Sequence, residues 1–203
     1  MPASRRPNPP TSATLLLRIR PDAPARELAW QDFHRCYAPM IAGFARKMGA
    51  KMQDREDVVQ DVMTGLFSAS PNFVYDPRKG RFRGFLKVCT FRAVRRRLGQ
   101  NIKLQGVPLT RIDPQALEID QVWNDVWEHE HLRRALRETR EKYQATPEML
   151  RTFRAFELVG LLEQPADDVA QRLGMSVDGV HQAKSRITKA LRQNLKKLEE
   201  IEG

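Results

Sequence analysis

The stretch that decides the fold is Pro165-Ala-Asp-Asp-Val-Ala-Gln-Arg-Leu-Gly-Met-Ser176, which continues as residues 177–198. The apolar residues of its first half share one helical face. Gly174 supplies the positive φ that a sharp turn demands. Ser176 is a natural N-cap, because its hydroxyl accepts hydrogen bonds from the first amides of the next helix. The segment therefore predicts a helix-turn-helix.

The helix expected after Ser176 is amphipathic and basic. Its apolar residues recur mostly three or four positions apart, which predicts one buried stripe. The opposite side carries side chains of the kinds that reach base edges and phosphates. These are Asp178, Gln182, Ser185, Arg186, Lys189 and Gln193. The pattern favours DNA binding, and the alternative is a helical hairpin whose basic face is only solvated.

The composition agrees with a polyanionic partner. The chain has 35 Lys and Arg against 25 Asp and Glu, a formal net charge of +10. Charge alone does not separate nucleic acid from a membrane surface or an acidic protein. No apolar run approaches the roughly 20 residues that span a bilayer, so we expect a cytoplasmic protein without membrane insertion. Cys36 and Cys89 fall within apolar helical patterns and are expected to be small buried thiols.

We expect an all-α protein of two small helical domains joined by a flexible linker. Residues 1–24 are rich in Pro, Ser and Arg, which predicts a disordered tail. Helical stripes within residues 25–99 predict a first domain whose third helix stops at Gly99. Residues 100–118 hold two prolines and no sustained period, which indicates the linker. Residues 119–203 then form the second domain, which ends in the helix-turn-helix.

A second unusual segment runs from Phe73 to Lys87 and continues to Arg97. It interleaves aromatic rings with Arg and Lys. That mixture suits single-stranded DNA, where bases stack on rings and cations follow the phosphates. The alternative is a core of rings with solvated arginines, which we prefer for Phe82 and Leu86. Both interpretations stay open for Tyr75, Arg81, Arg83 and Phe85.

Residues 54–61 are strongly acidic in an otherwise basic protein. One interpretation is a carboxylate metal site of a nuclease, built from Asp54, Asp57 and Asp61. A second is a capped helix with a solvated face, and a third is an acidic docking surface for a basic partner helix. No histidine or second acidic cluster supports metal chemistry. We therefore expect no metal, no cofactor and no catalytic residue.

Three blocks of the chain, in this order, resemble the bacterial sigma-70-type initiation factors. Asp54-Arg-Glu-Asp-Val-Val-Gln-Asp-Val62 resembles their second conserved block, and residues 73–86 resemble the block that melts and reads the minus-ten promoter element. Residues 165–192 resemble the helix-turn-helix that reads the minus-thirty-five element. The resemblance spans roughly residues 27–198, with two domains, as in the small extracytoplasmic-function class.

The resemblance implies a sigma factor that is not an enzyme and that directs core RNA polymerase to promoters and promotes DNA melting. It implies contacts with the largest-subunit clamp helices and the flap, and with duplex and single-stranded promoter DNA. It also admits an anti-sigma protein as a partner. The implied polymerase-binding residues are Glu56, Asp57, Gln60 and Asp61.

The resemblance also implies two sets of DNA-binding residues. Those for the minus-ten element are Tyr75, Lys79, Arg81, Arg83, Phe85, Lys87 and Arg92. Those for the minus-thirty-five element are Ser176, Asp178, His181, Gln182, Lys184, Ser185, Arg186 and Lys189. Two positions depart from the family pattern: Phe85 replaces the usual Trp, and Arg92 replaces a frequent Asn.

The main rival interpretation is a free-standing helix-turn-helix regulator that binds an operator as a dimer. It leaves the acidic block and the aromatic segment unexplained, and no heptad seam is evident to hold a dimer.

Overall fold

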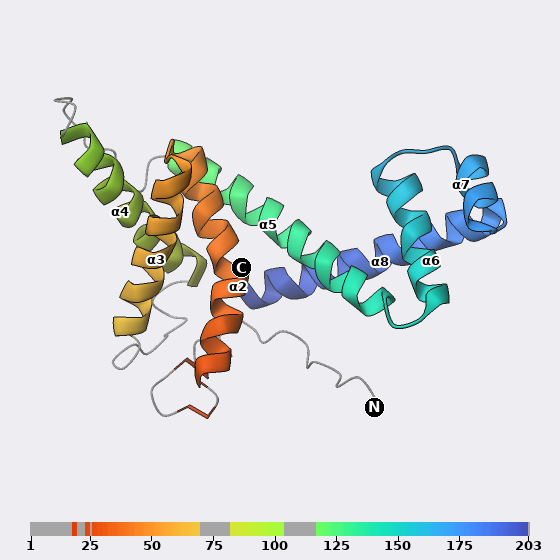
Figure 1. Cartoon of the computed structure of the whole chain (residues 1–203), viewed down its shortest axis with the longest axis horizontal. Coiled ribbons are helices and arrows are strands. Elements are labelled where there is room, and N and C mark those ends of the chain that lie inside the picture. Colours follow the sequence, from red (N-terminus) through yellow and green to blue (C-terminus); the bar gives the residue numbers. More distant parts are fainter. Residues whose placement is uncertain (1–17, 20–22, 25, 70–81, 104–116, 203) are drawn as a thin grey trace. The chain divides into compact units, whose positions relative to one another are not determined.

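The computed structural model describes residues 18–19, 23–24, 26–69, 82–103 and 117–202, and among these it contains helices and no strand (Figure 1). The expected all-α fold is confirmed. The expected tail, the segment 70–81 and most of the expected linker lie outside the described residues. The chain divides into two compact units, residues 1–130 with 200–203 and residues 131–199.

Unit 1 contains α2 (Arg26–Lys47), α3 (Met52–Ala69), α4 (Phe82–Lys103) and the first half of α5 (Leu117–Tyr143). The helices α2, α3 and α4 pack on one another in all three pairs. Each of these helices contributes apolar residues at helical spacing, and together these residues form one buried core. From α2 and α3 the largest contributors include Phe33, Tyr37, Phe44, Met40, Val58 and Leu66.

Aromatic side chains bring α4 and α5 into this core. The ring of Phe82 lies edge-on to Tyr37, with 5.1 Å between centroids. On α5, Trp123 lies edge-on to Phe44 at 5.1 Å, and Trp127 is buried beside Tyr37. Such edge-to-face pairs contribute beyond the burial of area alone.

These contacts change two expected boundaries. The expected second domain begins at residue 119, whereas the chain divides between Glu130 and His131, because the tryptophans of α5 are buried in unit 1. The third helix was expected to stop at Gly99, but α4 continues to Lys103. Gly99 is buried, and a glycine inside a helix costs only about 1 kcal/mol, so it does not by itself end one.

Unit 2 contains the second half of α5, α6 (Pro147–Phe156), the π-helical turn η2 (Glu157–Leu161), α7 (Ala166–Leu173) and most of α8 (Val177–Glu202). Two apolar clusters hold it together. One joins α6 and η2 to α7 and the start of α8, and the other joins α5 and α6 to the middle of α8. Both clusters therefore fix the orientation of α8 within its unit.

Candidate nucleic-acid interface

The turn between α7 and α8 has the predicted geometry. Gly174 adopts φ 61° and ψ 44°, the left-handed conformation that glycine favours. The hydroxyl oxygen of Ser176 accepts a hydrogen bond from the Gly179 amide at 3.0 Å. The predicted turn glycine and N-cap are both confirmed. Gly174 ends α7, and the Ser176 cap allows α8 to begin at the next residue, Val177.

The buried stripe of α8 leaves its polar side open. Val180 and Ile187 are completely buried, and Leu191 nearly so. Every residue expected to contact the minus-thirty-five element is exposed. These residues are Ser176, Asp178, His181, Gln182, Lys184, Ser185, Arg186 and Lys189. A helix packed along one stripe thus presents the rest of its surface for a major-groove contact.

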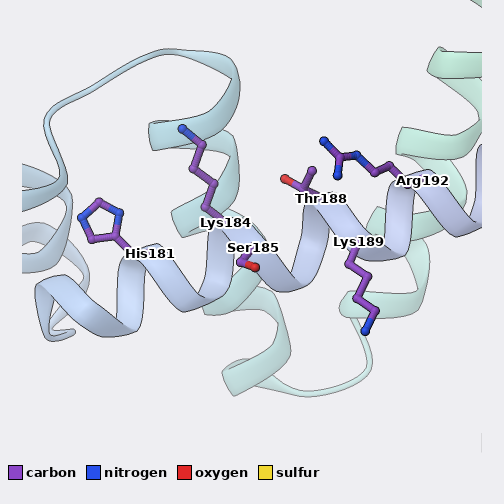
Figure 2. Close-up of a pocket in the computed structure, with 6 residues that line it drawn as sticks. All are labelled: His181, Lys184, Ser185, Thr188, Lys189 and Arg192. Atoms are coloured by element: carbon purple, nitrogen blue, oxygen red, sulfur yellow. The ribbon is translucent and has the colours of Figure 1, made fainter.

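Part of this side forms a shallow hollow, lined by His181, Lys184, Ser185, Thr188, Lys189 and Arg192 (Figure 2). Lys184, Thr188 and Arg192 extend to the same side of α8 in Figure 2. Thr188 and Arg192 were not among the expected site residues. Their positions, four and eight residues after Lys184, continue the same helical row, so the spacing could have included them. The cations lining the hollow suit a phosphate group.

On α4 the expected contact residues are divided. Tyr75, Lys79 and Arg81 lie outside the described residues. Phe85 is 38% exposed and Arg92 is exposed. Phe82 and Leu86 are buried, so the core interpretation is confirmed for both.

Two other expected contact residues of α4 are engaged by α5. Arg83 donates to the Asn124 side-chain oxygen at 2.6 Å, and its guanidinium carbon lies 5.1 Å from the centroid of the Trp127 ring. Lys87 forms an ion pair with Asp120. Nothing in the sequence pattern had indicated these partners.

The acidic face of α3 is also divided. Glu56 and Gln60 are exposed. Asp57 and Asp61 instead face α4, where Arg97 lies 3.2 Å from Asp57 and 3.0 Å from Asp61. Arg96 lies 2.8 Å from Asp61.

These ion pairs set the charge state of Asp61. Burial by itself raises the pKa of Asp61, but hydrogen bonds and charge attraction from Arg97 and Arg96 hold that pKa below its ordinary value. Two of the three carboxylates that the nuclease interpretation needs, Asp57 and Asp61, are therefore paired with arginines. Among the described residues, no group of three or more His, Cys, Asp or Glu is arranged to hold a metal ion.

Cys36 and Cys89 are free thiols, the first buried and the second partly exposed. No described helix combines the length and apolar character needed to cross a membrane.

One family model matches part of unit 1. Residues 33–101 match the family model described as sigma-70 region 2, which covers most of α2, all of α3 and most of α4. No curated protein matches the chain. Sigma-70 region 2 is a domain of sigma factors, and the match supports a role in transcription initiation. The match shows a likeness to sigma-70 region 2 over residues 33–101, about a third of the chain, and supports a sigma factor of the sigma-70 family.

Proposed function

We propose that the protein is a sigma factor of the extracytoplasmic-function class. In this proposal it binds core RNA polymerase, recognises the minus-thirty-five and minus-ten elements and promotes melting of promoter DNA. The observation that carries the proposal is the sigma-70 region 2 match, followed along the chain by a helix-turn-helix with an exposed basic side. A cytoplasmic location and an anti-sigma partner belong to the proposal as well.

Polymerase docking is assigned to α3. Glu56 and Gln60 are exposed, and Asp57 keeps about half of its side chain exposed beside them. An acidic helical face of this kind complements a basic partner helix, here the clamp helices of the largest subunit. The flap is the second polymerase surface, and we assign it to unit 2.

Minus-ten recognition is assigned to α4 and the segment before it. Phe85 offers an exposed ring on which an unstacked base can lie, and Arg92 is an exposed cation on the same helix. Phe85 is smaller than the Trp usual in the family, but any aromatic ring can stack on a base. The whole proposed set is Tyr75, Lys79, Arg81, Arg83, Phe85, Lys87 and Arg92.

Minus-thirty-five recognition is assigned to the start and middle of α8. The first turns carry Asp178 and Gln182, which would meet base edges, whereas Arg186 and Lys189 would mostly meet phosphates. Each DNA contact alone is weak. Holding both on polymerase raises their effective concentration, which explains a chain with two separate DNA-binding regions.

The proposal is tested by run-off transcription with core polymerase, with mapping of the start sites. Glu56→Arg should abolish core binding and transcription, because it sets a cation against the basic partner helix. Glu27→Arg is the matched control, since it reverses a charge of the same kind on a different helix, α2. Both variants should keep wild-type helicity.

Three results would overturn the proposal: no promoter-specific transcript, unchanged core affinity for Glu56→Arg, or a stable dimer on size-exclusion chromatography that binds duplex DNA without polymerase. The last result would instead support a dimeric helix-turn-helix regulator.

A further inference from the structure

The two helices that meet at Arg83 and Lys87 have opposite charge. α4 contains no Asp or Glu and carries the cations Arg83, Lys87, Arg92, Arg95, Arg96, Arg97 and Lys103. Residues 117–130 of α5 contain no Lys or Arg. Their carboxylates are Glu118, Asp120, Asp125, Glu128 and Glu130. An acidic half-helix therefore lies in the same unit as a basic helix, in a protein with a net charge of +10.

The contacts between these helices follow a regular register. Arg83 pairs with Asn124 and Lys87 pairs with Asp120, so that one turn forward on α4 corresponds to one turn back on α5. This is the register of two antiparallel helices. Two consecutive turns of α5 thus engage two cations that the proposed function assigns to DNA.

The chemistry of the α5 groups resembles that of single-stranded DNA. Asp120 presents a carboxylate to Lys87, as a phosphate would. Trp127 presents a ring face to the Arg83 guanidinium, as a base would. The side-chain oxygen of Asn124 accepts from the same guanidinium, as a phosphate oxygen or base edge would.

The acidic half-helix is anchored independently of its charged groups. Trp123 and Trp127 are each 2% exposed, and Ile119 is 4% exposed, all within the core of unit 1. The backbone that carries Asp120 and Asn124 is therefore held in place. The polar contacts themselves are partly exposed, with 41% of the Asp120 side chain accessible. Pairs of this kind are weak enough to exchange with a competing ligand.

We propose, on the basis of the function proposed above, that the first half of α5 is an internal ligand of α4 that mimics single-stranded DNA. It holds Arg83 and Lys87 until promoter DNA displaces Asp120 and Asn124. The exchange needs only side-chain movement, because the tryptophan anchors stay buried. α5 thereby weakens the binding of the free protein to non-promoter DNA. Promoter DNA held on polymerase is at high effective concentration and can still displace the α5 groups.

The test measures the affinity of the full chain for a fluorescein-labelled, mixed-sequence single-stranded DNA of twelve nucleotides, by anisotropy at fixed salt. Asp120→Ala should tighten binding about two- to fivefold, the range that a partly exposed ion pair corresponds to. Asp125→Ala is the matched control, because it removes the same charge from an exposed position on the same helix. It should change the affinity much less.

A second comparison separates release of Lys87 from a general charge effect. In a Lys87→Gln background, Asp120→Ala should no longer tighten binding, because the released cation is absent. Asn124→Ala, which removes the side-chain oxygen that accepts from Arg83, should tighten binding by itself and serves as a second variant if Asp120→Ala unfolds. Equal gains from Asp120→Ala and Asp125→Ala, or a gain that persists without Lys87, would overturn the proposal.

Arg92→Ala separates the internal ligand of α4 from the minus-ten role of that helix. Arg92 is exposed on α4, so Arg92→Ala should weaken DNA binding if α4 contacts DNA at all. An unchanged affinity for Arg92→Ala would count against the minus-ten role of α4. A loss at Arg92→Ala together with no gain at Asp120→Ala or Asn124→Ala would leave that role standing and remove the internal ligand.

Discussion

The helices α4 and α8 are both basic and both proposed to bind DNA, but they use their charged residues differently. α8 is buried along one stripe, and all of its expected contact residues are exposed. α4 packs against α2 and α3 and also contacts α5. Its cations are divided: Arg83 and Lys87 contact α5, Arg96 and Arg97 contact α3, and Arg92 is exposed.

The difference shows on which kind of helix a charged residue predicts a contact with a ligand. On a helix with one buried stripe, polar residues away from the stripe reach solvent and are available to a ligand. On a helix that packs against several others, a cation can pair with a carboxylate of a neighbouring helix as readily as with a phosphate of a ligand. A basic composition therefore predicts ligand contacts well for α8 and only in part for α4.

The largest effect is expected where α4 is core. Phe82→Ala should lower the free energy of unfolding of unit 1 by about 3–5 kcal/mol, because it empties a fully buried aromatic site. Phe85→Ala, three residues further on, should cost less, about 1–2 kcal/mol, because its ring is partly exposed. The three tryptophans, Trp30, Trp123 and Trp127, all lie in unit 1, so tryptophan fluorescence during urea unfolding reports this unit.

Phe85→Ala should nevertheless weaken binding to single-stranded DNA, since stacking is worth about 1–3 kcal/mol per base. The two phenylalanines thus divide α4 into a core side and a ligand side. Equal losses of stability from the two substitutions would erase this division, and so would an unchanged DNA affinity for Phe85→Ala.

The second effect concerns α8, where the proposed DNA-contact residues are exposed and do not pack in the core. Gln182→Ala should relax base preference upstream by about 1–3 kcal/mol of discrimination without changing the unfolding free energy. Lys189→Ala should weaken binding about equally on all sequences and reduce the salt slope by about one. A library selection with duplex DNA measures both. Altered base preference in Lys189→Ala with parental preference in Gln182→Ala would show that the faces of α8 are assigned wrongly.

The sequence predicted most of the fold, for reasons that differ between regions. The turn between α7 and α8 was predictable because Gly174 and Ser176 act through local backbone geometry. The domain boundary was not, because Trp123 and Trp127 have helical spacing whichever core they join, and only long-range packing decides. The ion pairs of Asp61 with Arg96 and Arg97 were missed for the same reason, since 36 residues separate Asp61 from Arg97.

The third, smaller effect concerns two glycines: Gly174, in the turn before α8, and Gly84, within α4. Gly174→Ala should destabilise unit 2 by about 1–2 kcal/mol, because φ 61° is unfavourable for a residue with a Cβ. An added Cβ would meet no atom within 4 Å, so the cost is that of the backbone alone. Gly84→Ala on α4 also meets open space, but within a helix, and should stabilise unit 1 by about 0.5 kcal/mol. Thermal melts followed by circular dichroism compare the two, and destabilisation by Gly84→Ala would contradict the helical conformation assigned there.

The smallest effect is the acid dependence of the α3–α4 ion pairs. Because the pKa of Asp61 in the folded protein lies below its ordinary value of 3.8, the ionised carboxylate stabilises unit 1 at pH values above 3.8. That contribution, about 1 kcal/mol or less for a pair near the surface, is lost as the pH falls from 3.8 through the lower folded-state pKa. Asp61→Asn should therefore lower stability at pH 7 and flatten its fall in acid, and Arg97→Gln should flatten it similarly. Urea unfolding followed by tryptophan fluorescence at pH 7 and in this acid range measures the difference. If both variants kept the acid dependence of the wild-type protein, the arginines of α4 would not be stabilising the acidic helix, and all the cations of α4 would have to be reconsidered as ligand contacts like those of α8.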